Sequence, residues 1–243
     1  MTNVLFLDTE TPGFAKPMRP IESATIFAAG DSPMVMVTGD RTVHRWCCPK
    51  EVFEYGAMAV HNILPDDVAL CPSFNVHEFR DRHLGGVDYL IGHNVDFDWE
   101  VVGKPDVKRI CSLAVCRYFW PDLDAHKLGA MMYYIFGANN ETRSWLIEAH
   151  SAGADVENCM NLLVKVAELK GINTWTRMYG ISEMGRVPYR MTFGKHGPKD
   201  GRKGMIIADM VKNDPGYVRW MKNNMDDMDP YLRKALDNPR VLP

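Results

Sequence analysis

A run of apolar residues that ends in two carboxylates is the feature of this sequence that most constrains its fold. Residues 4–7 are all large and apolar, as in a fully buried β-strand, and Asp8 and Glu10 follow where that strand should end. Residues two apart on an extended chain point to the same side. Two negative charges are therefore aimed at one spot beside a hydrophobic core, which is unfavourable unless a positive charge lies between them. The stretch predicts a cation site at the end of a buried strand.

The composition is that of a globular protein with a sizeable core. Of the 243 residues, 46% are hydrophobic and 24% charged, which suits one large domain or a main domain with a small appendage. No apolar run approaches the roughly 20 residues that span a bilayer, and no signal-peptide pattern opens the sequence, so we expect a cytoplasmic protein without membrane contact. The six cysteines lack disulfide-scaffold spacing and favour free thiols, with a zinc site at Cys47 and Cys48 as the open alternative.

Apolar strands alternate with amphipathic segments along the chain. This alternation predicts an α/β domain with a mixed sheet. Gly180, Gly185 and Pro188 interrupt the pattern and predict a linker over 176–189, between a main domain at 1–175 and a small module at 190–243. After the first strand, we expect further strands within 21–30, 33–39, 42–49 and 87–94, and helices within 126–137 and 155–170.

Two further groups of titratable residues follow predicted elements. Asp96, Asp98 and Glu100 come just after the apolar strand within 87–94, at the end where ligands bind open α/β sheets. Later, His150 precedes Asp155 by five positions, a rotation of about 140° on one continuous helix, so the two would not share a helical face. The geometry that brings them together has His150 on a loop and Asp155 in the first turn of the next helix.

The order of these groups resembles the three exonuclease motifs of the DnaQ-like superfamily in its DEDDh branch. The matching stretches are "DTET", "GHNVDFD" and the H-x4-D spacing. The family pattern H-N-x-x-F-D selects Asp98 rather than Asp96. The resemblance implies an RNase H-like exonuclease fold, with a mixed central sheet flanked by helices. The catalytic residues it implies are Asp8, Glu10, Asp98, His150 and Asp155.

Softer matches place further residues near the cleft. "PIES" puts Glu22 where the family often has an Ile-Glu pair, and "AMAVHNI" resembles a family segment whose histidine here is His61. Phe14, just after the first motif, offers a surface for stacking a terminal base. The substrate contacts we expect in the main domain are Thr9, Thr11, Phe14, His61, Asn94 and Phe97.

The segment 192–236 resembles the small C-terminal module of exodeoxyribonuclease X, with its F-G-K, G-K and D-P-x-Y-x-R-W pattern. Charge is distributed unevenly: residues 1–185 carry a net −8, whereas 186–222 carry nine basic and three acidic side chains, a net +6. A basic segment on an acidic body suits a protein that approaches a polyanion, although a solvated basic face is the alternative. We expect Lys195, Arg202 and Lys203 to contact DNA, with Asp214 capping a helix that begins at Pro215.

The resemblance implies a metal-dependent 3′–5′ exonuclease that releases nucleoside 5′-monophosphates from DNA 3′ ends, single-stranded or duplex. Two Mg²⁺ ions, replaceable by Mn²⁺, would bind to Asp8, Glu10, Asp98 and Asp155. In this scheme Asp8 bridges the ions, and His150 takes a proton from the attacking water.

Other functions stay open on sequence alone. The carboxylate motifs do not sense a 2′-hydroxyl, so an exoribonuclease of the same superfamily is an alternative. A polymerase-associated proofreading exonuclease and a non-catalytic nucleic-acid-binding protein are others. Relatives suggest a homodimer, and the resemblance implies a role in DNA repair.

Overall fold

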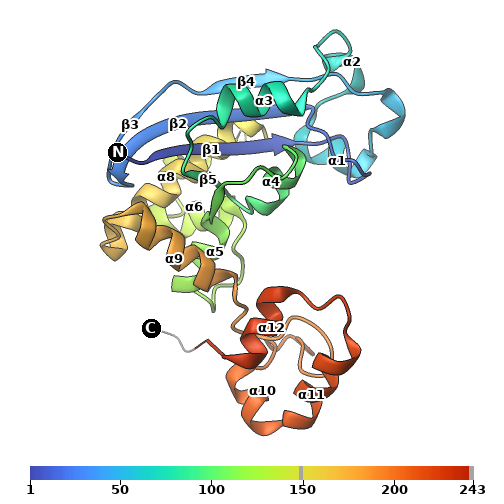
Figure 1. Ribbon diagram of the computed structural model, residues 1–243, viewed down its shortest axis with the longest axis vertical. Helices are drawn as coiled ribbons and strands as arrows, with labels where there is room; N and C mark the ends of the chain where they lie inside the picture. The colour runs from blue at the N-terminus through green and yellow to red at the C-terminus, as the bar shows by residue number, and fades with distance from the viewer. Residues whose placement is uncertain (148–149, 241–243) are drawn as a thin grey trace. The chain divides into compact units, whose positions relative to one another are not determined.

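The computed structural model describes residues 1–147 and 150–240 (Figure 1). The chain divides into two compact units, which are considered separately. Unit 1 comprises Met1–Leu113 and Asp124–Gly180, and unit 2 comprises Ala114–Leu123 and Ile181–Pro243.

Unit 1 is built on one mixed sheet whose central strand is the apolar run of the sequence. Within the described residues the order is β3-β2-β1-β5-β6, with β4 also pairing β2. β1 runs antiparallel to β2 and parallel to β5, so both its edges are covered. The strands are β1 (Asn3–Glu10), β2 (Glu22–Ser32), β3 (Val35–Thr38), β4 (Thr42–Arg45), β5 (Tyr89–Gly92) and β6 (Lys108–Cys111).

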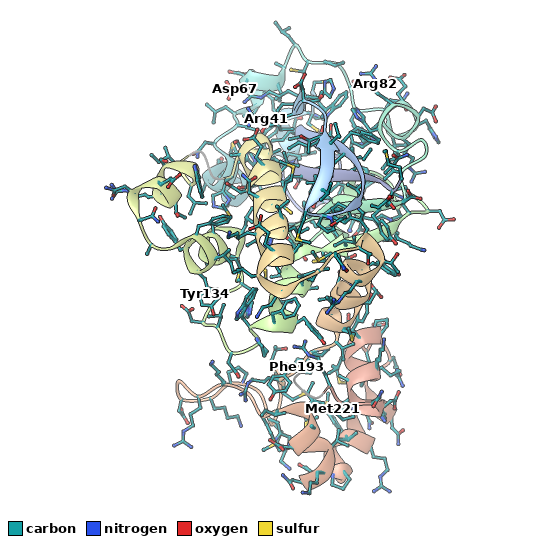
Figure 2. All side chains as sticks on the ribbon, turned by 90° about the vertical axis from the view of Figure 1, so that its left-hand side faces the viewer. Arg41, Asp67, Arg82, Tyr134, Phe193 and Met221 are labelled. Atoms are coloured by element: carbon teal, nitrogen blue, oxygen red, sulfur yellow. The ribbon has the colours of Figure 1, made fainter. Side chains whose placement is uncertain are left out.

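Helices cover both faces of this sheet. α3 (Val76–His83) lies on one face and α8 (Ala152–Lys170) on the other, as both views show (Figures 1 and 2). Val4, Leu5, Phe6 and Leu7 are each at most 2% exposed between these layers, which explains why no polar residue interrupts the run. The other helices of unit 1 include α1 (Tyr55–His61), α2 (Pro65–Val68), α4 (Asp96–Val101), α6 (Leu128–Phe136) and α7 (Asn140–Trp145), with a short 3-10 turn at Lys50–Val52.

The strands expected from the sequence are present, and β6 is an addition. It escaped the pattern analysis because Lys108 and Arg109 occupy half of its four positions. The predicted helices are present as α6, which ends before Gly137, and α8. The six cysteines are free thiols, as predicted. Within the described residues, no helix is long and apolar enough to cross a bilayer.

The segment predicted as a linker over 176–189 is largely helical, and the boundary between the two units, at Gly180 and Ile181, falls inside it. α9 (Trp175–Arg186) runs through it, and both of its glycines lie within the helix. Gly185 serves close packing there, because a Cβ atom would lie 1.9 Å from the carbonyl oxygen of Ala114. At the start of α9, Trp175 is buried and its indole N–H donates to the carbonyl oxygen of Gly30 at 3.0 Å. Gly185 therefore reflects close packing within a helix rather than an interruption of it.

Unit 2 packs short helices around a methionine-rich core. α10 (Ile207–Asn213), α11 (Pro215–Asn224) and α12 (Pro230–Asp237) follow one another, and α5 (Ser112–Phe119) contributes its last residues. Met221 lies among these helices (Figure 2). The core comprises Val187, Met191, Ile207, Met210, Val218, Met221, Met228, Leu232, Ala235 and Leu236.

Asp214 begins α11 as predicted, and it also joins two parts of unit 2. Its carboxylate accepts the backbone N–H of Tyr217 at 3.2 Å, which caps the helix. The same group accepts hydrogen bonds from Lys195 Nζ at 2.5 Å and His196 Nε2 at 2.8 Å. The hydrogen bond from Lys195, followed by that from His196, holds the pKa of Asp214 well below its usual range.

We expect Asp214→Ala to lower the melting temperature of unit 2 by a few degrees at neutral pH. Because the folded-state pKa is depressed, this stabilisation is present above the ordinary aspartate pKa and is lost as pH falls through the folded value. The difference between variant and parent should therefore shrink below about pH 4. Thermal unfolding followed by circular dichroism measures it, with the exposed Asp226→Ala as control. Equal melting temperatures for the two variants at pH 7 would contradict the capping role.

Candidate active site and metal centre

Three carboxylates converge at the end of β1. Asp8 and Glu10 project from the same side of that strand, and Asp155 comes from the first turn of α8. One ligand oxygen from each lies within 4.8 Å of the others, and all three side chains are partly buried. Among the described residues, these three carboxylates are the one group of at least three potential ligand side chains that could hold a metal ion. Cys47 and Cys48 belong to no such group in the described parts of the chain.

The N-terminus of α8 is fixed by several contacts, which set the position of Asp155. Ser151 caps the helix by accepting the N–H of Ala154 at 3.3 Å. Arg41, near this end of α8 in Figure 2, donates to the carbonyl oxygen of Gly153 and pairs with Glu157 at 3.0 Å. Asp155 therefore projects from a rigid helical turn.

Glu22 joins the same helix end to the sheet. One carboxylate oxygen of Glu22 accepts the N–H of Ala152 at 3.0 Å, and the other accepts Arg45 Nε at 2.9 Å. The side chain is only 4% exposed. The sequence singled out Glu22 by resemblance but gave no sign of this bond, because its partner lies 130 positions away.

His150 lies on the loop before α8, as the five-residue spacing predicts. Its backbone is in the left-handed region, with φ 70°, and its N–H donates to Asp155 Oδ2 at 3.3 Å. The residue is exposed. The backbone of His150 is therefore anchored to a candidate metal ligand while its imidazole faces solvent.

Asp98 lies on α4 and is held from β1. It is 3% exposed, and its Oδ1 accepts the hydroxyl hydrogen of Thr9 at 2.7 Å. Thr9, expected to contact substrate, thus orients this carboxylate. Asp98 is outside the three-residue group described above, but its charge acts on Asp8.

Crowding and burial make the ionised site unfavourable without a cation. Burial, followed by the charges of Asp98 and Asp155, raises the pKa of Asp8 well above its usual range. Burial and Asp155 raise the pKa of Glu10 to about 8, and burial raises the pKa of Asp98 to about 7 despite the bond from Thr9. Burial also raises the pKa of Asp155, although His150 opposes this. Clustered hard oxygen donors of this kind fit Mg²⁺ or Mn²⁺.

An aromatic pair lies beside the loop that follows the first motif. Phe14 is 71% exposed, and its ring meets the ring of Phe97 edge-on with centroids 6.2 Å apart. Glu54 holds this loop by accepting the N–H of Phe14 at 3.1 Å and donating its own N–H to the carbonyl oxygen of Pro12 at 2.7 Å. The sequence analysis missed Glu54, since no local pattern links it to this loop. The Thr11 hydroxyl donates to the carbonyl oxygen of Gly13, inside the same loop.

The remaining predicted contacts of unit 1 differ in exposure. His61 is 6% exposed, and its Nδ1 accepts the N–H of Ile63 at 2.9 Å. Its Nε2 has no hydrogen-bond partner among the described residues, and burial lowers the pKa of the ring. Asn94 is exposed with φ 73°, and its carbonyl oxygen accepts the N–H of Phe97 at 3.0 Å.

The three basic residues predicted to contact DNA lie in unit 2, and two of them have partners there. Lys195 bonds to Asp214, and Lys203 donates to the carbonyl oxygen of Asp122. Arg202 is exposed and has no acidic side chain paired with it in the described parts of the chain. The structure thus divides this group into residues that stabilise unit 2 and a residue that faces solvent.

Comparisons with known proteins agree with the geometry. No family model matches the chain. Exodeoxyribonuclease 10 of Escherichia coli K12 is 30% identical over 182 residues, which are 74% of this chain and 76% of that protein. The chain belongs to the DnaQ-like DEDDh exonucleases. As a member of this family it is a 3′–5′ exonuclease that acts on nucleic acid.

Solved structures show the same fold at lower identity. An exonuclease X bound to duplex DNA with a 5′ overhang superposes with a TM-score of 0.55 at 23% identity, covering 75% of this chain and 99% of that one. The nuclease domain of 3′hExo, a DEDDh family member bound to rAMP, gives 0.53 at 13% identity, covering 71% and 94%. These likenesses confirm the predicted RNase H-like exonuclease fold.

Replacing Glu10 tests the electrostatic cost of the site. A carboxyl whose pKa is raised on folding contributes stability below its unfolded value, near 4.5, and loses it as pH rises towards about 8. In EDTA, Glu10→Gln should therefore melt higher than the parent by about 2 °C or more at pH 8.5, with the gap closing towards pH 5.

The exposed Glu141→Gln on α7 serves as control and should show no such pH dependence. Added Mg²⁺ should stabilise the parent more than Glu10→Gln, because the lost carboxylate is one of the ligands. If the difference in melting temperature between Glu10→Gln and the parent stays constant from pH 5 to 8.5, ionised Glu10 does not destabilise the metal-free protein as proposed.

Proposed function

We propose that this protein degrades DNA from its 3′ end and releases nucleoside 5′-monophosphates, using two divalent cations. The observation that carries the proposal is the convergence of Asp8, Glu10 and Asp155 at the end of the central strand. Asp98 adds a fourth carboxylate that acts electrostatically on Asp8. Four acids crowded in this way are stable as anions only when cations neutralise them.

The ligand set suits Mg²⁺, with Mn²⁺ as a substitute, because both prefer hard oxygen donors. Asp8 would contribute to both sites, Glu10 and Asp155 would complete one, and Asp98 would support the other. Bound there, the ions supply charge neutralisation and Lewis-acid polarisation for phosphodiester hydrolysis. Thr9 keeps Asp98 in place by its hydroxyl hydrogen bond.

His150 is the general base in this proposal. Its exposed imidazole is free to accept a proton from the attacking water, while its backbone N–H is bonded to Asp155. This bond fixes the backbone of His150 beside a proposed metal ligand.

The terminal nucleotide would lie against the Phe14–Phe97 pair. An exposed ring backed by a second aromatic residue gives an unstacked base a flat apolar surface. Glu54 and Thr11 fix the loop on which Phe14 lies. Asn94 and His61 would contact the nucleotide from the neighbouring segments.

DNA is favoured as substrate because Exodeoxyribonuclease 10, a protein 30% identical to this chain, is by name an exodeoxyribonuclease. The solved structures of exonuclease X and E. coli ExoI are complexes with DNA. ExoI superposes with a TM-score of 0.52 at 21% identity, covering 74% of this chain and 42% of that one. The 3′hExo structure with rAMP keeps RNA as the second candidate.

The decisive assay follows 3′-labelled and 5′-labelled DNA with Mg²⁺, Mn²⁺ and EDTA, beside RNA of the same sequence. We expect mononucleotides to be released from the 3′ end, EDTA to abolish release, and Asp8→Ala to be inactive. If RNA is degraded faster than DNA, the preferred substrate is RNA, and the proposed mechanism stays the same. Undiminished cleavage by purified Asp8→Ala would leave a non-catalytic binding protein as the better description.

A second variant tests the base. His150→Ala should lower kcat by about 10²- to 10⁴-fold with little change in KM, because the proton acceptor is lost while binding remains. Added imidazole should restore part of the activity. His77→Ala, an exposed histidine on α3, is the matched control. Parental kcat in His150→Ala would exclude this role.

A further inference from the structure

Unit 2 carries a defined basic hairpin that the hydrolytic scheme does not use. Lys199 and Arg202 pair across it through two backbone hydrogen bonds of 3.2 and 2.9 Å, and the N–H of Met205 bonds to the carbonyl oxygen of His196 nearer its base. Asp200 and Gly201 form the tip, both with positive φ, 51° and 74°. An Asp-Gly pair in this conformation makes the tight two-residue turn that matches the twist of a hairpin.

Four cations between 186 and 222 have no acidic partner among the described residues: Lys199 and Arg202 next to the tip, Lys212 on α10 and Arg219 on α11. Of the nine basic residues between 186 and 222, five are paired with acids: Arg186, Arg190, Lys195, Lys203 and Lys222. Lys199 and Arg202 are exposed, and no acidic side chain is paired with either among the described residues. The fixed turn thus presents to solvent two positive charges that form no ion pair in the described parts of the chain, with the exposed carboxylate of Asp200 between them in sequence.

An aromatic stack lies on α11, which contacts the base of this hairpin; Tyr217 packs partly against the core of unit 2, and Trp220 is exposed. Tyr217 and Trp220 stack with centroids 5.6 Å apart and an interplanar angle of 13°. The Tyr217 hydroxyl accepts the N–H of Lys195 at 3.2 Å, and His196 meets the Tyr217 ring edge-on at 5.2 Å. Gly194 allows this approach, because a Cβ there would lie 2.4 Å from the Tyr217 hydroxyl.

This arrangement holds Trp220 ready for a ligand. Tyr217 covers one face of the indole, yet 53% of the Trp220 side chain is exposed. Phe193, just before the hairpin and labelled in Figure 2, is 43% exposed. Exposed aromatic side chains and unpaired cations on the same compact unit are features of surfaces that bind unpaired nucleic-acid bases and their phosphates.

We propose that the hairpin and the Tyr217–Trp220 stack bind single-stranded nucleic acid, with phosphates on Lys199 and Arg202 and an unstacked base on Trp220. The positive charge selects a polyanion, and the open indole face selects unpaired bases, because duplex bases are already stacked on one another. The choice of DNA as ligand rests on the proposed function, whereas the binding surface lies in unit 2, outside the carboxylate site.

The test uses the full-length chain with Asp8→Asn, so that bound DNA is not degraded. Binding of fluorescent oligothymidine is followed by anisotropy between about 50 and 200 mM salt. Trp220→Ala should weaken binding by about 5- to 150-fold, the value of one stacked base, with the salt slope unchanged. Trp220→Phe should retain most of the affinity.

Removing charge should produce a different signature. Lys199→Ala with Arg202→Ala should reduce the salt slope by about 1.4, since each phosphate contact on a single strand contributes roughly 0.7. Arg233→Ala with Lys234→Ala, two exposed cations on α12, removes equal charge from the same unit and should leave the slope unchanged. Melting curves verify that every variant is folded.

The outcomes separate this surface from the nuclease. The proposal is overturned if Trp220→Ala and the hairpin variant bind as tightly as the α12 control. It is also overturned if the α12 control loses as much of the salt slope as the hairpin variant does. Binding of duplex that is equally sensitive to Trp220→Ala also overturns base stacking. If the parent chain does not cleave DNA while these binding effects appear, the proposed function fails and the binding surface stands.

Discussion

The repulsion among buried carboxylates at the end of β1 is the constraint on which the rest of the structure depends. Asp8 and Glu10 come from the central strand, Asp98 from α4 and Asp155 from α8. The charges of Asp98, Asp155 and Glu10 all raise the pKa of Asp8, and Asp155 also raises the pKa of Glu10 and Asp98. Flexible side chains would separate to relieve this repulsion. The chain instead mounts them on a strand covered on both edges and on two helices, so the energy of the sheet core opposes their separation. Such an arrangement is useful only if the repulsion is converted into affinity for cations.

The carboxylate cluster also requires that the N-terminus of α8, which carries Asp155, be held in place against the sheet. Glu22 reaches from β2 to the N–H of Ala152, and Arg41 reaches to the carbonyl oxygen of Gly153. Unpaired N–H groups at a helix start favour an anionic acceptor, and here a buried carboxylate fills that role. Glu22 also adds negative charge near Asp8 and Glu10, but its bond to Arg45 offsets part of it. Glu22 and Arg41, which are not proposed metal ligands, thus help to fix the position of Asp155.

Local periodicity was enough to predict the pairing of Asp8 with Glu10, because a spacing of two on a buried strand has one geometric outcome. The loop position of His150 followed equally from helical rotation. The bonds of Thr9 to Asp98 and of Glu54 to Phe14 could not be read from sequence, since each joins segments that only folding brings together. The helical conformation of the predicted linker could not be read from sequence for a related reason. Glycine signals either flexibility or close packing, and the partner that decides between them, Ala114, is remote from Gly185.

Charge counting also has a physical limit, which unit 2 illustrates. A net +6 over 186–222 suggests that the whole segment faces a polyanion, yet Lys195 is bonded to Asp214 and Lys203 is close to Asp122. A cation already paired with a carboxylate gains less from a phosphate, because the new contact must replace the old one. The strength of a basic surface therefore depends on which charges the fold leaves uncompensated. In unit 2 a turn closed by backbone hydrogen bonds carries two cations without an ion pair among the described residues, Lys199 and Arg202, so the backbone that supports a phosphate contact there is ordered before any ligand arrives.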